Sequence, residues 1–247
     1  RFWGSGNQSL FGHAGLAVQA IMQVMDTRIG DGQMVMGCIG ALRELLDACN
    51  ESQGGIRLEL KTAISTKIDA RGLQLLGRCI SAHCSDDQLL KVVLEFQGAL
   101  EGVRAVLVEM QKHPSVESVQ GFGAQTIGTL YAEEELDETT KGLATQCLRH
   151  ISNCIVAAPE NRILQQHGCF AMYSIMEALG AEAHLLPNKA VVAASRAAVA
   201  ALASVAEIPD KDHSTGSWDA MYVRKESMRC LGGCLQARPL VCTMLLR

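Results

Sequence analysis

Proline and aromatic residues are scarce in this sequence of 247 residues, with five prolines and an aromatic content of 4%. Segments that alternate between polar and apolar residues, with the β-branched and aromatic side chains typical of strands, are also missing. These absences disfavour a β-rich core. Because 48% of the residues are hydrophobic, and most of these are small or aliphatic, the composition predicts an all-α protein in which helices pack on helices.

Long uncharged apolar runs are missing too, and none approaches the roughly 20 residues that a membrane-spanning helix needs. The most hydrophobic window, residues 191–208, contains Arg196 and Glu207, which favours a buried helix. The formal net charge of −4 is spread along the chain, which disfavours a surface for nucleic acid or anionic membranes. We therefore expect no transmembrane segment and no nucleic-acid partner.

Recognisable catalytic and cofactor motifs are also absent. The glycines at 4–6 and 121–123 are not followed by Lys-Ser or Lys-Thr and are not preceded by a strand pattern, so they do not form phosphate loops. The seven histidines lie in no pattern with serine, cysteine and aspartate that indicates nucleophilic catalysis. We expect a protein that is not an enzyme, with no cofactor and no small-molecule substrate.

Ten cysteines are present, scattered at apolar helix positions, which favours reduced thiols inside a cell over a disulfide framework. Some lie three or four residues from another cysteine or a histidine, a spacing that places two metal ligands on one helix face. These groups are Cys79, His83 and Cys84, then His150 and Cys154, then Cys230 and Cys234. Because no second ligand cluster completes a site, we expect core cysteines and no bound metal.

An internal repeat is the strongest pattern in the chain. A helical stripe at Val103, Val106, Leu107 and Met110 matches Val18, Ile21, Met22 and Met25 when 85 is subtracted, and Ile127 and Leu130 likewise match Leu42 and Leu45. Since 85 is about twice the length of a helical repeat, we expect an intervening unit within residues 50–97. A third copy, at Met172, Ile175, Met176 and Leu179, stands 69 residues after the stripe at Val103. The pattern therefore predicts an irregular array of helices.

Residues 144–179 connect this array to a known family. Small and aliphatic positions define a first helix (Ala144, Cys147, Leu148, Ile151), a short second helix (Asn161, Ile163, Leu164, then Gly168) and a third helix over 170–179. This arrangement resembles an armadillo repeat. The pattern Met110, His113, Pro114, Val119, Gln120 and Gly123 is similar to an armadillo variant with a His-Pro loop. The resemblance covers about residues 15–45 and 98–206, and a HEAT-type repeat is the alternative for 50–97.

The resemblance implies a right-handed armadillo-like α-solenoid over residues 15–247. It also implies a non-catalytic adaptor that holds other protein subunits in its groove. Because the third helix of each armadillo unit lines the groove, we expect the partner to contact Gln19, Gln23, Arg104, Val108, Tyr173 and Glu177. Arg104 and Tyr173 are the principal candidates, since these residue types often dominate binding energy. The alternative is a structural accessory subunit built permanently into a large multiprotein complex. Complexes associated with organellar membranes are among the candidates.

Residues 1–14 combine Gly, Ser, Asn and Gln with aromatic residues, which predicts an extended arm. Phe2, Trp3 and Phe11 are its candidate contacts with a partner. The chain has no initiator Met, which indicates a processed form or a fragment, and its first acidic residue is Asp26. We expect a cytoplasmic protein, with the mitochondrion as the alternative.

Overall fold

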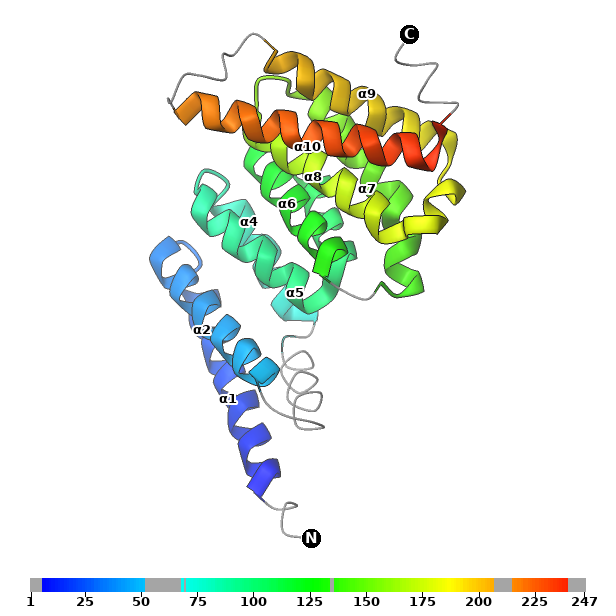
Figure 1. Cartoon of the computed structure of the whole chain (residues 1–247). Helices are drawn as coiled ribbons and strands as arrows, with labels where there is room; N and C mark the ends of the chain where they lie inside the picture. The colour runs from blue at the N-terminus through cyan, green and yellow to red at the C-terminus, as the bar shows by residue number, and fades with distance from the viewer. Residues whose placement is uncertain (1–5, 52–67, 69, 134–135, 207–214, 240–247) are drawn as a thin grey trace. The chain divides into compact units, whose positions relative to one another are not determined.

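The computed structural model describes residues 6–51, 68, 70–133, 136–206 and 215–239, and all of its regular structure in these ranges is helical (Figure 1). The predicted all-α class is therefore confirmed. The chain divides into two compact units, residues 1–100 and 101–247. The boundary falls within helix α5 (Asp87–Lys112), beside Gly102, whose φ of 71° interrupts the helix. Glycine suits that position because it adopts positive φ without steric strain.

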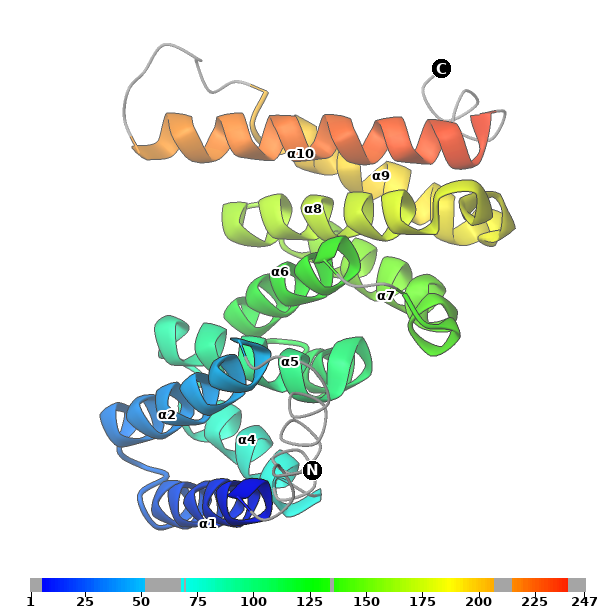
Figure 2. The same cartoon turned by 60° about the horizontal axis from the view of Figure 1, so that its bottom comes forward.

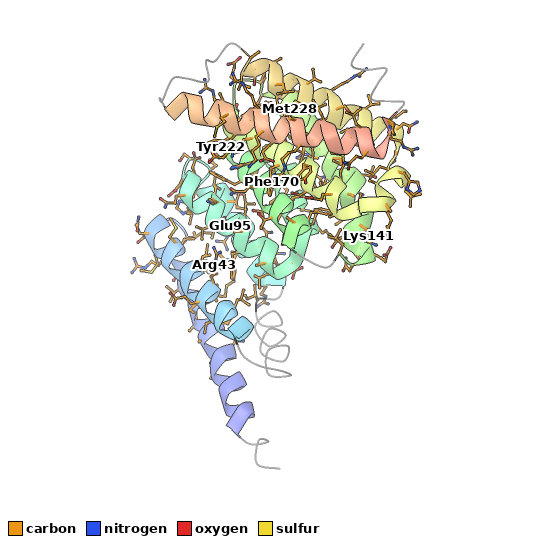
Figure 3. The ribbon with its side chains drawn as sticks, viewed as in Figure 1. Arg43, Glu95, Lys141, Phe170, Tyr222 and Met228 are labelled. Carbon is orange, nitrogen blue, oxygen red and sulfur yellow. The ribbon has the colours of Figure 1, made fainter. Side chains whose placement is uncertain are left out.

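Unit 1 contains α1 (Gly6–Thr27), α2 (Gly32–Glu51), α4 (Ala70–Ala82) and the start of α5. The predicted extended arm is wrong for residues 6–14, because α1 begins at Gly6. Val18 and Met25 are fully buried and anchor the helix, and extending a formed helix backwards needs no new nucleus. Residues 1–5 lie outside the described part of the chain. An ion pair of 3.0 Å joins Arg43 of α2 to Glu95 of α5 (Figure 3).

The described part of unit 2 contains the end of α5 and five further helices. These are α6 (Glu117–Glu133), α7 (Glu138–Ala157), α8 (Arg162–Leu179), α9 (Asn188–Ser204) and α10 (Thr215–Ala237), with a 3-10 turn, η1 (Gly180–Leu185), after α8. Helices α6, α8 and α10 pack side by side in that order, and α7 packs on α9 (Figure 2). These helices form hairpins, and in each hairpin we call the earlier helix the first and the later helix the second. The second helices α6, α8 and α10 form one row, and the first helices, α7 and α9 among them, form another.

The predicted division of residues 144–179 into three helices is wrong. A single α8 runs from Arg162 to Leu179, and Gly168 lies inside it. A Cβ at Gly168 would stand 2.7 Å from Cδ1 of Ile155. The glycine therefore serves a close approach between α8 and α7, and it does not make a turn.

The same hydrogen-bonded turn joins the two helices of four hairpins in the described part of the chain. In the first copy, the amide of Arg28 donates to the carbonyl of Val24, that of Asp31 to Arg28, and that of Val35 to Asp31, at 2.8 to 3.0 Å. The same three bonds recur in the turns that begin at His83, His113 and Ala158. The chain is thus built from repeated helical hairpins.

The positions of these turns test the repeat alignment. The turns at Arg28 and His113 are 85 residues apart, which confirms the predicted offset, and the turn at His83 supplies the intervening unit. The next turn, at Ala158, follows His113 by 45 residues. The predicted offset of 69 is therefore wrong, since an offset of 45 makes Met172 equivalent to Ile127 and not to Val103.

Side chains cap three of the four helices that follow these turns. Oδ1 of Asp31 accepts from the amide of Met34, Oδ1 of Asp86 from that of Leu89, and Oδ1 of Asn161 from that of Leu164, at 2.9 to 3.1 Å. These bonds satisfy amides that a helix start leaves without partners. The capping residues fix where each second helix begins, and so fix the register of its apolar face.

Candidate functional site

Gln120 and Gln165 close two successive hairpins in the same way. Nε2 of Gln120 donates to the carbonyls of Met110 and His113, at 2.8 and 2.9 Å. Nε2 of Gln165 donates to the carbonyls of Ile155 and Ala158, both at 2.8 Å. These carbonyls lie at the ends of first helices, where the helix supplies no donor. Each buried glutamine side chain therefore caps the C-terminal end of the first helix in its own hairpin.

The fixed amide of Gln120 directs its oxygen toward α7. Oε1 accepts from Nε2 of His150 at 2.9 Å and from Sγ of Cys154 at 3.2 Å. Since a carbonyl oxygen only accepts, Nε2 of His150 carries the proton. These three side chains lie at a cavity of about 400 Å³ whose other lining residues are Pro114, Ser115, Glu117, Asn153, Ala157, Ala158 and Leu164. The cluster joins the hairpin of α5 and α6 to the hairpin of α7 and α8.

The chemistry of this cluster is that of a protonated thiol. Burial raises the pKa of Cys154 to about 11 and lowers the pKa of His150. Nucleophilic attack and metal binding both need a thiolate. At neutral pH, Cys154 and His150 are therefore both uncharged, and their S···N separation of 3.6 Å reflects a shared acceptor and not an activated pair.

The other predicted cysteine groups are placed differently. Cys79 is buried while Cys84 is exposed, and Nε2 of His83 lies 2.7 Å from the carbonyl of Ile29. Cys230 and Cys234 are both buried. Within the described ranges, no group of three or more His, Cys, Asp or Glu side chains is arranged to hold a metal ion.

A groove of about 270 Å³ crosses the row of second helices, and we call it the row groove. Its lining residues are Gln125 and Thr129 of α6, Gln166, His167 and Phe170 of α8, and Tyr222, Lys225 and Glu226 of α10. Figure 3 shows Phe170 and Tyr222 on neighbouring helices. Tyr222 is 41% exposed, and a Cβ at Gly128 would stand 2.6 Å from the ring of Phe170. The groove thus offers aromatic surface beside amide groups.

A charged cluster borders the row groove on α8 and α10. The carboxylate of Glu226 is only 8% exposed and lies 3.2 Å from Nη1 of Arg229 and 3.9 Å from Nζ of Lys225. The guanidinium of Arg229 stacks 4.0 Å above the ring of Tyr173, a cation–π contact. The hydroxyl of Tyr173 donates to Glu177. Intramolecular contacts therefore hold these groups in place at the edge of the groove.

The six residues predicted to line one groove belong to different helices of their hairpins. Tyr173 and Glu177 lie on α8, a second helix. Arg104 and Val108 are exposed on the part of α5 that forms a first helix, and Gln19 and Gln23 are exposed on α1 in unit 1. The predicted equivalence of Arg104 and Tyr173 fails with the offset of 69. With the offset of 45, Arg104 corresponds to Arg149.

None of the three predicted arm residues has a side chain that the structure describes. Phe2 and Trp3 lie outside the described residues, and Phe11 lies in α1, where its side chain is not among those described. The sequence analysis did not identify Phe170 and Tyr222 as surface residues, because an aromatic residue in a helical segment is more often part of the core. The helical period counted from the fully buried Ala220 and Val223 places Tyr222 off the buried face of α10.

Comparisons with protein-family models, with curated proteins and with solved structures find no match to this chain. None of the helices in the described ranges combines the length and the apolar character needed to cross a membrane.

Proposed function

We propose that this protein is a non-catalytic scaffold that binds a segment of another protein in the row groove. The observation that carries the proposal is that three successive second helices contribute side chains to one open groove. Grooves shared by adjacent repeats are the extended binding surfaces that helical repeat proteins use. The repeated hairpins support an α-solenoid as the architecture. We propose for it the right-handed, armadillo-like form that the sequence resemblance implies, with α8 as one helix where the family has two.

The side chains of the row groove suit a peptide chain. Phe170 and Tyr222 offer the large, rigid aromatic surface that often dominates binding energy. The amides of Gln125 and Gln166 offer donors and acceptors for the main chain of a bound segment. A small polar ligand would leave the aromatic surface uncovered, so the groove favours a protein partner.

The alternative function is an accessory subunit built permanently into a larger complex. Exposed apolar side chains on α10, at Met221, Met228 and Leu235, favour it, because such surface is commonly covered in an assembly. For either function we propose an intracellular location, and the cytoplasm is the favoured compartment. The buried thiols of Cys79, Cys147 and Cys169 support it, because such thiols suit a reducing compartment.

Photo-crosslinking tests the proposed function. A photoreactive phenylalanine analogue replaces Tyr222 in the row groove, and in a control protein it replaces Arg149, which is exposed on α7. We expect a covalent adduct with a partner protein from position 222 and none from position 149. Adducts from position 149 alone, or from neither position, would overturn the assignment of the groove.

Binding measurements with the crosslinked partner complete the test. Phe170→Ala combined with Tyr222→Ala should weaken the affinity by roughly 30-fold or more, because alanine substitution at such anchors commonly costs above 2 kcal/mol. Arg149→Ala is the matched control and should leave the affinity unchanged. Helical circular dichroism of each variant shows whether the fold is intact.

A further inference from the structure

A stripe of large apolar side chains runs along the outer face of α10, and we call it the α10 stripe. Met221, Met228 and Leu235 stand seven residues apart and are 43%, 61% and 37% exposed. Two heptads along a helix span roughly 21 Å, and this spacing keeps the three side chains on one face. Gly232 lies on the same face, and a Cβ built there would meet nothing within 4 Å.

The opposite face of α10 is the one that packs within unit 2. Ser227 donates to Sγ of Cys169 at 3.4 Å, and Sγ of Cys234 lies 3.6 Å from Sδ of Met176, both in α8. On a helix of 3.6 residues per turn, Met228 points away from Cys230, which is fully buried. The α10 stripe therefore lies on the face of α10 opposite its packed residues.

The exposed charged side chains that the structure describes on α9 and α10 are all cations. Lys225 and Arg229 on α10 are 59% and 41% exposed. Helix α9, which packs against α10, carries Lys189 and Arg196, both exposed, and no acidic residue. Glu226 is the single carboxylate whose side chain the structure describes on α9 and α10, and it is buried beside Arg229. This surface is opposite in sign to the net charge of −4 of the whole chain.

We propose that the α10 stripe docks an amphipathic helix of a partner protein whose apolar seam is flanked by acidic residues. A straight helix presents apolar side chains at the heptad spacing that the stripe displays. The open position at Gly232 allows such a helix to approach closely. Acidic flanks complement Lys225, Arg229 and the cations of α9, and charge complementarity of this kind selects the partner and speeds its association.

Other occupants fit these observations less well. A second copy of the chain would bring two cationic surfaces together, which costs free energy. An anionic membrane would favour a broader apolar face, whereas the α10 stripe is a single row of three side chains. The proposal does not rest on the row groove, because the stripe residues Met221, Met228 and Leu235 do not line that groove.

The test uses a synthetic helical peptide of about three heptads, with leucine at the a and d positions and glutamate at e and g. The control peptide has lysine at e and g. Fluorescence anisotropy with the full chain should show binding of the acidic peptide, at least tenfold tighter than that of the basic peptide. Equal binding of the two peptides, or no binding of the acidic one, would overturn the proposal.

Variants locate the site. Met228→Glu should weaken binding of the acidic peptide at least tenfold, while Val156→Glu, a matched change at an exposed position of α7, should not. Phe170→Ala should also leave this binding unchanged, which separates the α10 stripe from the row groove. Self-association in light scattering that Met228→Glu abolishes, or binding to phosphatidylserine vesicles that this variant abolishes, would assign the stripe to a second copy or to a lipid surface, and each result would overturn the proposal.

Discussion

Gln120 and Gln165 occupy equivalent positions in successive hairpins, yet their side-chain oxygens differ in their surroundings. Oε1 of Gln120 accepts two hydrogen bonds, from His150 and Cys154 of the following first helix. Oε1 of Gln165 is buried, and no donor among the described residues reaches it. The same capping interaction therefore exists in two versions. In one the side-chain oxygen of the glutamine accepts hydrogen bonds, and in the other it accepts none from the described residues.

This difference predicts unequal effects of the same substitution. Gln120→Met removes two bonds to carbonyls and leaves the donors of His150 and Cys154 without their acceptor, so we expect a loss of about 2–4 kcal/mol of unfolding free energy. Gln165→Met also removes a buried oxygen that has no donor, so its cost should be about 1–2 kcal/mol lower. Urea denaturation of both variants measures the difference. Equal costs, or a larger cost at Gln165, would contradict the hydrogen bonding described here.

The close approach at Gly168 gives a second prediction. An added methyl group would stand 2.7 Å from Cδ1 of Ile155 and 3.2 Å from Cγ2 of Ile151. Gly168→Ala should therefore destabilise unit 2 by about 1–3 kcal/mol. Gly142→Ala is the control in α7, where a Cβ meets nothing within 4 Å, and it should stabilise by about 0.5–1 kcal/mol. Thermal denaturation that moves both midpoints in the same direction would count against this packing.

The buried stripes of the hairpins give a third prediction. Leu107 and Met176 are each 3% exposed, so Leu107→Ala and Met176→Ala should each cost about 2–5 kcal/mol. Gln111→Ala, at an exposed position of α5, should change stability by less than about 0.5 kcal/mol. Equal tolerance at all three positions in a thermal assay would show that the stripes are not the core.

The described cysteines should differ in their reactivity. Burial raises the pKa of Cys147 and of Cys169 to about 12, whereas Cys84 is exposed. Iodoacetamide at pH 8 should therefore label Cys84 before these two, as peptide mass spectrometry would show. Because the folded-state pKa values of Cys147 and Cys169 exceed the ordinary value of 9.0, their stabilising effect is complete below pH 9 and is lost as the pH rises toward 12. Rapid native labelling of Cys147 or Cys169 at pH 8 would contradict their burial.

Much of the fold was accessible from the sequence because apolar residues at helical spacing report burial directly. The offset of 85 was correct because both copies of the stripe, at Val18 and Val103, lie the same distance before the same turn. The offset of 69 failed because apolar spacing does not distinguish a first helix from a second helix. The hydrogen-bonded turns make that distinction, and they depend on backbone geometry that Asp31, Val116 and Asn161 all permit.

The candidate site was harder to predict from the sequence, for a related reason. Tyr173 was selected from its residue type, and it does lie at the edge of the row groove, but Arg104 was paired with it through the wrong offset. Phe170 and Tyr222 come together because α8 and α10 are neighbours in the row of second helices. Such a contact between segments distant in sequence leaves no periodic signal in either segment.

Hydrogen exchange of the chain with and without the crosslinked partner tests the central claim most directly, because it reports where a protein partner binds. Peptides that cover residues 166–173 of α8 and 222–229 of α10 should exchange more slowly in the complex, while those that cover 146–153 of α7 should not change. Slower exchange in α7 with no change in α8 and α10 would contradict the account, and so would a complex that protects none of these segments.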